Sequence, residues 1–178
     1  MSPTWTPWSA PSRQRSHCSR PRPELPASVR VSGKASSASI AAMYQEALLA
    51  HHRAPHNRRD MPDANASAVF KNPVCGDEIQ VFVRVDGGHL VDVSFTGRGC
   101  SIATASASMM TDAVMGLSVS EAQGLSAALE RTLVSPDETV ALPDVLVPLR
   151  SVAPFPGRHG CVRMAWQALH QAVQNATE

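Results

Sequence analysis

The chain has 178 residues, enough for one domain with a hydrophobic core and too few for two comfortable ones. Its formal net charge of +1 argues against nucleic acid as the main partner, because phosphate binding needs a strong basic surplus. Apolar residues make up 43% of the chain and aromatic residues 4%, which predicts an aliphatic, Ala-rich core. The longest apolar runs fall far short of the roughly 20 residues that span a bilayer, which excludes a membrane protein.

Residues 1–38 differ in composition from the rest of the chain. Pro, Ser and Arg dominate this segment, and Glu24 is the only acidic residue before Lys34. Such a segment buries too little apolar surface to offset its chain entropy, so we expect a disordered tail. Its arginines would fit a transit peptide, but its prolines argue against the amphipathic helix that such a peptide needs. A solvated tail, or a translation start assigned too far upstream, is the favoured interpretation, and residues 39–178 are the predicted domain.

The first part of this domain predicts a helix followed by an antiparallel sheet. From Ser39 apolar residues recur at three- and four-residue intervals, which is typical of an amphipathic helix. Residues 79–85 and 91–95 alternate apolar with polar and predict two strands. The Asp-Gly-Gly sequence at 86–88 between them is a hairpin turn signal, because glycine tolerates the positive φ of tight hairpins. Residues 68–71 predict a short edge strand.

A basic segment follows the first helix, which Pro55 must end. His51, His52 and His56 lie in this segment among several arginines. Three histidines at this spacing could be metal ligands. Because the neighbours in sequence are cations rather than an acid or a thiolate, a solvated basic surface is the favoured interpretation.

The second half of the chain predicts helices. Residues 101–115 are rich in Ala, Ser and Met, and their small side chains permit close packing. Residues 118–133 predict one or two helices that begin with a Ser/Glu capping box. Residues 143–152 predict a short helix, and the apolar stripe at 162–173 predicts a final one. The expected fold is α+β, with a small antiparallel sheet of about three strands packed against about five helices.

Four cysteines are present, and Cys18 lies in the predicted tail. The odd number that remains cannot be exhausted by internal disulfides, and the chain shows no export signal. A reducing, cytoplasmic compartment is therefore expected. In that compartment clustered cysteines bind metal or do chemistry more often than they form bridges.

The other cysteines lie in glycine-bounded loops at the ends of predicted elements. Cys75 and Asp77 share the loop that enters the first main strand, and Cys100 precedes the Ala/Ser/Met helix. Cys161 is predicted to begin the last helix. At a helix N-terminus the free N–H groups and the dipole favour a thiolate, as expected for Cys100 and Cys161. Three thiolates and a carboxylate form a tetrahedral ligand set suited to Zn²⁺.

Two other interpretations of these cysteines compete with that one. They could be small buried hydrophobic residues that happen to be cysteine. They could also hold a purely structural zinc ion, but such sites usually use paired C-x₂₋₄-C knuckles. The dispersed ligands of this chain favour an exposed and exchangeable metal.

From about Met43 to its C-terminus the chain resembles the SufU/IscU/NifU N-terminal family of iron–sulfur cluster assembly proteins. The matching motifs are Tyr44 to Asn57, Asn72-Pro73-x-Cys75-Gly76-Asp77, Gly97-x-Gly99-Cys100 with the helix that follows, and Arg158-x-x-Cys161 with Trp166. The second cysteine motif is highly specific.

Two details favour the SufU branch of this family over the IscU branch. The interval between Cys100 and Cys161 is long, as in SufU relatives. IscU proteins have a histidine immediately before the last cysteine, where this chain has Gly160. His159 lies one residue further back, so the role of the IscU histidine is not carried over to it. SufU relatives usually have a lysine at the Gly160 position.

The resemblance implies a zinc-dependent acceptor of persulfide sulfur from a SufS-type cysteine desulfurase. Such a protein passes the sulfur to a downstream iron–sulfur assembly complex and is a sulfurtransferase-like relay rather than a stand-alone enzyme. The implied zinc ligands are Cys75, Asp77, Cys100 and Cys161, and Cys75 is the implied sulfur acceptor.

In the IscU branch the same cysteines hold a transient [2Fe–2S] cluster, and the last of them, here Cys161, takes the sulfur. A scaffold for such a cluster is therefore one alternative function. A structural zinc-binding partner module is the other.

Overall fold

The computed structural model describes residues 37–73, 76–135 and 140–177. The elements are α1 (Ser37–Arg53), β1 (Ala66–Lys71), β2 (Glu78–Asp86), β3 (His89–Arg98), α2 (Ser101–Val114), α3 (Val119–Val134), the 3₁₀ helix η1 (Asp144–Val152) and α4 (Pro156–Thr177). In these described ranges the predicted α+β class, with three strands and five helices, is confirmed. The predicted tail lies outside the described residues except for its last two positions, which already belong to α1. Within the described ranges, every helix is too short or too polar to cross a membrane.

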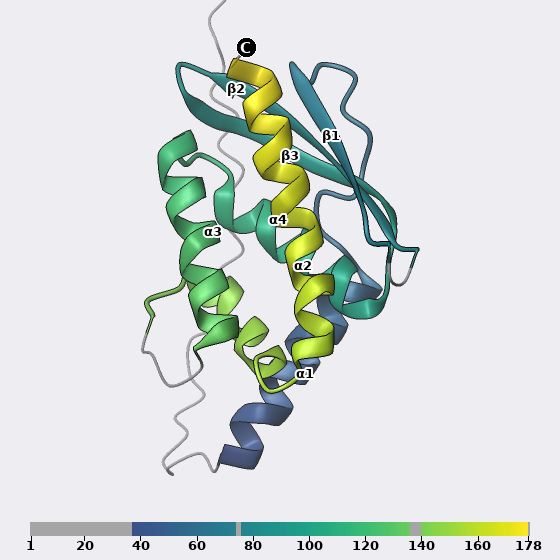
Figure 1. Cartoon of the computed structure of the whole chain (residues 1–178), viewed down its shortest axis with the longest axis vertical. Helices are drawn as coiled ribbons and strands as arrows, with labels where there is room; N and C mark the ends of the chain where they lie inside the picture. The colour runs from purple at the N-terminus through teal and green to yellow at the C-terminus, as the bar shows by residue number, and fades with distance from the viewer. Residues whose placement is uncertain (1–36, 74–75, 136–139, 178) are drawn as a thin grey trace, which may run out of the picture. The chain divides into compact units, whose positions relative to one another are not determined.

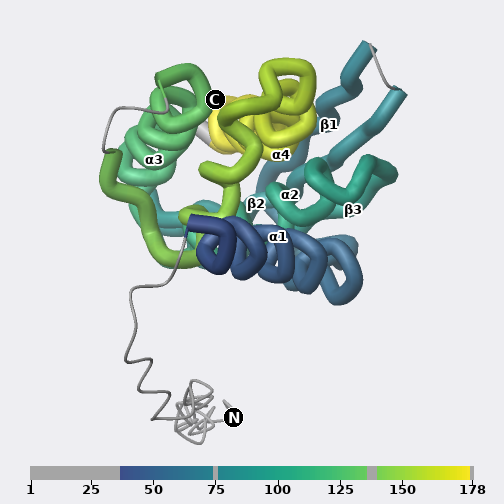
Figure 2. The backbone as a smooth tube through the Cα atoms, turned by 90° about the horizontal axis from the view of Figure 1, so that it is seen from below, coloured from purple at the N-terminus to yellow at the C-terminus, as the bar shows by residue number. Residues whose placement is uncertain are grey.

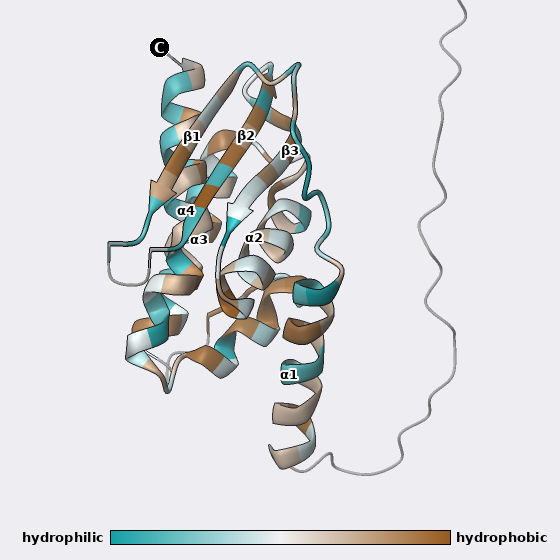
Figure 3. Ribbon diagram, turned by 90° about the vertical axis from the view of Figure 1, so that its right-hand side faces the viewer, coloured by the Kyte–Doolittle hydropathy of each residue, from teal (hydrophilic) through white to brown (hydrophobic). Residues whose placement is uncertain are grey.

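The sheet is antiparallel with the order β1-β2-β3, so each strand pairs with its neighbour in sequence. Burial alternates along β2, where Ile79, Val81 and Val83 are buried and the residues between them are partly exposed. This alternation places one apolar face of the sheet against the helices. Figure 3 shows the strands side by side, with α4 and α2 behind them.

Helices α4 and α2 form the layer that covers this face. α4 runs along β1 and β2, and α2 packs against α4 and β3 (Figure 1). Seen from below, α2 lies between α4 and α1, while α3 lies beside α4 on the side away from β1 (Figure 2). The residues from Ala103 to Thr111 are all buried, because small side chains allow α2 to be packed on several sides.

The start of α3 confirms the predicted capping box. The Ser118 backbone N–H donates to the Glu121 carboxylate at 2.8 Å, and the Glu121 N–H donates to the Ser118 hydroxyl at 3.3 Å. Residues 119–134 form one helix rather than two. The short helix predicted at 143–152 is present as η1, with 3₁₀ rather than α geometry.

Candidate metal centre

Asp77, Cys100 and Cys161 lie together in the folded chain. One carboxylate oxygen and the two sulfur atoms are all within 4.8 Å of one another. Asp77 and Cys100 are half-buried and Cys161 is buried, and neither cysteine is in a disulfide. The three side chains come from the β1–β2 loop, the start of α2 and the first part of α4. Three separate segments therefore converge on one cluster of metal-ligating atoms.

The β1–β2 loop is closed by its own backbone. The Asn72 N–H donates to the Asp77 carbonyl at 2.9 Å, and the Gly76 N–H donates to the Asn72 carbonyl at 2.9 Å. Gly76 has a φ of +72°, a conformation that glycine adopts without strain. Cys75 belongs to this loop by sequence but lies outside the described residues. Its place beside the other three residues remains a prediction.

The Asp77 carboxylate also binds the start of α2. Cys100 is the N-cap residue of α2, as predicted, and its side chain makes no capping hydrogen bond. Instead, the Asp77 Oδ2 atom accepts a 2.9 Å hydrogen bond from the Cys100 backbone N–H. A negative charge at a helix N-terminus is favourable because the unpaired N–H groups there carry partial positive charge.

Gly97 lets β3 approach β2 just before Cys100. It pairs with Ile79 in the sheet and has a φ of +129°. A Cβ atom at Gly97 would collide with the carbonyl oxygen of Glu78. The close approach of the two strands therefore depends on this glycine, and it brings Cys100 next to the end of the β1–β2 loop.

Cys161 is held by the contact between α2 and α4. The buried Ser106 hydroxyl donates to the Val162 carbonyl at 2.8 Å, one residue beyond Cys161. The prediction that Cys161 begins the last helix is wrong, because α4 already begins at Pro156. Proline is well suited to the first helical position. Cys161 thus lies in the second turn, where the helix dipole favours a thiolate less than at the first.

His159 points away from this cluster. It is 7% exposed, and its Nε2 atom lies 2.9 Å from the Ala153 carbonyl oxygen. Gly160, the next residue, lies near Asn72, whose Nδ2 atom would be 3.5 Å from an added Cβ. Among the described residues, then, the cluster is made of two thiols and a carboxylate and contains no histidine.

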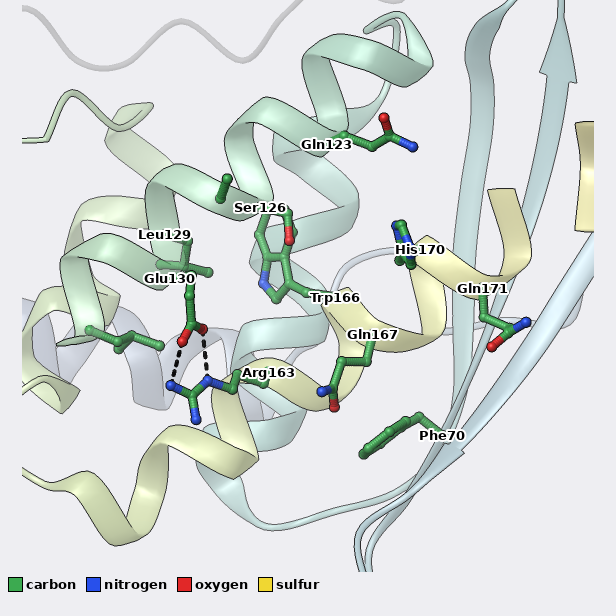
Figure 4. Close-up of a pocket in the computed structure, with 12 residues that line it drawn as sticks. Phe70, Gln123, Ser126, Leu129, Glu130, Arg163, Trp166, Gln167, His170 and Gln171 are labelled. Carbon is green, nitrogen blue, oxygen red and sulfur yellow. Dashed lines mark hydrogen bonds and ion pairs between the residues drawn. The ribbon is translucent and has the colours of Figure 1, made fainter. Parts of the chain in front are cut away.

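A cavity of about 650 Å³ lies elsewhere, between β1, α3 and α4. Phe70 and Trp166 line it, and Arg163 donates two hydrogen bonds to the Glu130 carboxylate at 2.5 and 2.7 Å (Figure 4). None of the metal-ligating side chains described above reaches this cavity. Trp166, part of the third sequence motif, is 4% exposed and belongs to the hydrophobic core.

A second group of metal-ligating side chains includes two of the three histidines that the sequence analysis weighed as metal ligands, together with an aspartate that it did not consider. His51, His56 and Asp112 each offer one ligand atom within 4.8 Å of the others. The solvated basic surface was favoured because no acid or thiolate lies near these histidines in sequence, but the packing of α1 on α2 brings Asp112 to them. The His56 Nδ1 atom is 2.6 Å from Asp112 Oδ2. No local pattern could have joined residues so far apart in sequence.

Known proteins show the same domain. Residues 43–177 match the model of the NifU-like N terminal domain. The "Zinc-dependent sulfurtransferase SufU" of Bacillus subtilis (strain 168) is 32% identical over 139 residues, which cover 77% of this chain and 93% of the relative. The "Iron-sulfur cluster assembly scaffold protein IscU" of Streptococcus pyogenes serotype M1 is 37% identical over 136 residues, or 75% and 84% of the two chains.

A solved structure of a protein of the same kind has a fold similar to that of this chain. It is a candidate iron–sulfur cluster assembly scaffold protein for the SUF system from Fervidobacterium islandicum AW-1, with a TM-score of 0.65 and 27% identity. The match covers 74% of this chain and 97% of that one. The family match over residues 43–177 includes the whole sheet, α2, α3, η1, α4 and the candidate metal centre. The chain therefore belongs to the NifU-like N terminal domain family, together with the SufU and IscU proteins.

Proposed function

We propose that this protein serves iron–sulfur cluster assembly by accepting persulfide sulfur from a SufS-type cysteine desulfurase and passing it on. The observation that carries the proposal is the convergence of Asp77, Cys100 and Cys161 within 4.8 Å. The loop that presents Asp77 also contains Cys75. A relative of similar length named as a zinc-dependent sulfurtransferase supports the same function.

The donor atoms fit a zinc ion. Two thiols and one carboxylate, with Cys75 as the fourth donor, give four ligands of the types that tetrahedral Zn²⁺ accepts. Bonds of about 2.3 Å to sulfur and about 2.0–2.2 Å to oxygen require only small movements from the present separations. A bound zinc would hold the cysteines as thiolates. The Asp77 hydrogen bond to Cys100 uses one carboxylate oxygen and leaves a second that can bind the metal.

The sulfur step is a thiol exchange. The Cys75 thiolate attacks the outer sulfur of the desulfurase persulfide and forms a new S–S bond to it. The bond between the two sulfurs on the desulfurase breaks, and its electron pair leaves on the desulfurase cysteine as a thiolate. The persulfide is then on Cys75, with no net oxidation.

Solvent access argues against Cys161 as the sulfur acceptor. Cys161 is only 5% exposed, under the contact between α2 and α4. A sulfur that must meet the persulfide of another protein has to reach solvent. We therefore propose Cys75, the acceptor that the family resemblance implies, rather than Cys161.

The test combines metal analysis with desulfurase activity. The purified protein is expected to contain about one zinc ion per chain and to increase the rate of alanine release from cysteine by the desulfurase. Cys75→Ser should abolish this stimulation and the protein-bound persulfide. Cys18→Ser, which changes the cysteine outside the domain, should leave both unchanged. Full stimulation by Cys75→Ser would show that another thiol takes the sulfur.

A cluster scaffold is the second candidate, because a relative that is 37% identical is named as one. Anaerobic reconstitution separates the two functions. A [2Fe–2S] cluster that is stable and transferable to an acceptor protein would overturn the relay. Zinc that stays bound, without cluster formation, supports it.

A further inference from the structure

We propose that His51, His56 and Asp112 form a second binding site, for a divalent transition-metal ion of the Zn²⁺ class. Their three ligand atoms lie within 4.8 Å of one another. Imidazole nitrogen and carboxylate oxygen are ligands that such ions accept. The proposal does not rest on the thiol site, because Asp112 follows Ser101 by eleven residues along α2, or roughly 16 Å at 1.5 Å per residue.

The ligands come from three segments that are held in place by backbone contacts. His51 lies in the last turn of α1 and Asp112 near the end of α2. The loop with His56 is tied to β3, since the Phe95 N–H donates to the Asn57 carbonyl at 3.1 Å and the Arg59 N–H donates to the Phe95 carbonyl at 3.0 Å. A metal site built on held segments loses little entropy on binding.

The side chains of His51 and Asp112 each have a hydrogen-bonding partner outside the cluster, and the backbone of His56 has one. The buried Ser108 hydroxyl lies 2.8 Å from His51 Nδ1 and also accepts a 2.8 Å hydrogen bond from the His56 backbone N–H. Asn57 Nδ2 donates to Asp112 Oδ1 at 3.1 Å. Metal-binding histidines and carboxylates typically have such outer partners. With Nδ1 of His51 engaged by Ser108, its Nε2 atom remains for an ion.

An ion can reach this site from solvent. The side chains of His56 and Asp112 are 59% and 29% exposed. Bonds of about 2.0–2.2 Å in a tetrahedral site place ligand atoms about 3.3 Å apart. The 2.6 Å contact of His56 with Asp112 must therefore open slightly, and exposed side chains can turn to allow this. Water would fill the positions that remain.

Binding would tie α1 to the rest of the domain. α1 contains no buried residue, although it packs on α2 and η1. An ion shared by His51 and Asp112 would link the end of this helix directly to α2. Binding to the folded state alone also stabilises it, by mass action.

The experiment uses the full chain and Co²⁺ as the probe. Metal is first removed with a chelator, and bound Co²⁺ is then measured by equilibrium dialysis and by absorption. An ion at the cysteines gives thiolate-to-cobalt charge-transfer bands in the near ultraviolet, and an ion at His51, His56 and Asp112 does not. We expect a Co²⁺ ion that adds ligand-field absorption without adding charge-transfer absorption.

Two variants and a control assign this ion. His56→Arg keeps a hydrogen-bond donor beside Asp112 but removes a ligand, and Asp112→Asn keeps a hydrogen-bonding group of the same size. Each should weaken the second ion by at least about 100-fold, more than the loss of an outer partner causes. His52→Ala removes an exposed histidine outside the cluster and should change the affinity by less than about 2-fold. Circular dichroism checks that each variant is folded. If His56→Arg does not fold, the result for Asp112→Asn decides whether the site exists.

Three results separate the outcomes. Wild-type binding of Co²⁺ at the cysteines alone would overturn the second site and show that His56 and Asp112 form only an ion pair. Unchanged binding in both variants would also overturn it, because the ion would then lie elsewhere. Co²⁺ binding that depends on His56 and Asp112, without any charge-transfer absorption, supports this site. The same result would contradict the thiol centre of the proposed function.

Discussion

The Asp77 carboxylate accepts a 2.9 Å hydrogen bond from the Cys100 backbone N–H and so joins the β1–β2 loop to the start of α2. The same carboxylate lies with the sulfur atoms of Cys100 and Cys161. Asp77 thus caps a helix and, in the proposed function, also binds a metal. These two contributions can be separated by substitution.

Asp77→Asn should remove the ligand and keep the cap, because the amide oxygen still accepts from the Cys100 N–H. Asp77→Ala removes both and should also lower the free energy of unfolding by about 1 kcal/mol. Zinc content and desulfurase stimulation are expected to fall in both variants. Urea unfolding of the metal-free proteins measures the difference in stability. A zinc content equal to wild type in Asp77→Asn would contradict a role for Asp77 as a ligand.

Gly97→Ala should destabilise the protein by at least about 2 kcal/mol, because its φ of +129° is strained for alanine. An added Cβ would also collide with the carbonyl oxygen of Glu78. Gly124→Ala is the matched control, since a Cβ there meets nothing within 4 Å. Because alanine favours helix, the control should stabilise α3 by about 0.5–1 kcal/mol. Thermal unfolding compares the two variants with the wild type. A melting temperature of Gly97→Ala equal to that of the wild type would contradict the close approach of β2 and β3.

Ser106→Ala should loosen the position of Cys161. It removes the buried hydrogen bond to the Val162 carbonyl and is expected to cost about 1 kcal/mol. We expect Cys161 to be alkylated faster in the metal-free variant than in the metal-free wild type. Mass spectrometry of the modified peptide measures this rate. Ser126→Ala, a change on α3, serves as control and should leave the alkylation rate of Cys161 as in wild type. Equal rates in both variants would show that the α2–α4 contact does not shield this thiol.

The stability of the metal-free protein should fall as the pH is lowered through and below 6.5. In the folded state burial and the neighbouring His56 lower the pKa of His51 below its ordinary value of 6.5, so the unfolded chain binds this proton first. Proton binding then favours the unfolded state. The loss of stability is complete once the pH is below the pKa that His51 has in the folded state. His51→Gln should show a shallower dependence between pH 7 and pH 5 in urea unfolding with chelator present. An identical slope in the variant would mean that other groups cause the pH dependence.

Several local features could be predicted from the sequence. The alternation of residues 79–85 predicts a strand, and in β2 the apolar positions are buried on one face. Ser118 and Glu121 stand three residues apart and form the expected capping box. Cys100 was predicted to precede the Ala/Ser/Met helix, and it is the N-cap residue of α2. These predictions hold because hydrogen bonding and side-chain direction over a few residues decide them.

One local prediction was wrong for a local reason. The Pro-x-Pro-Gly sequence at 154–157 resembles a loop, but Pro156 is compatible with the first turn of a helix, where its missing N–H is not needed. Cys161 consequently lies further inside α4 than expected. The composition of this segment was equally consistent with both conformations.

The residue types at the candidate centre were determined by the sequence alone: thiols and a carboxylate in glycine-bounded loops, in a pattern shared with one family. Only the tertiary structure decided that Asp77 caps α2, that His159 turns to Ala153, and that Asp112 meets His51 and His56. The physical reason is distance along the chain. Contacts such as that of His56 with Asp112, 56 residues apart, form only when apolar burial packs α1 onto α2, and no short-range pattern records them.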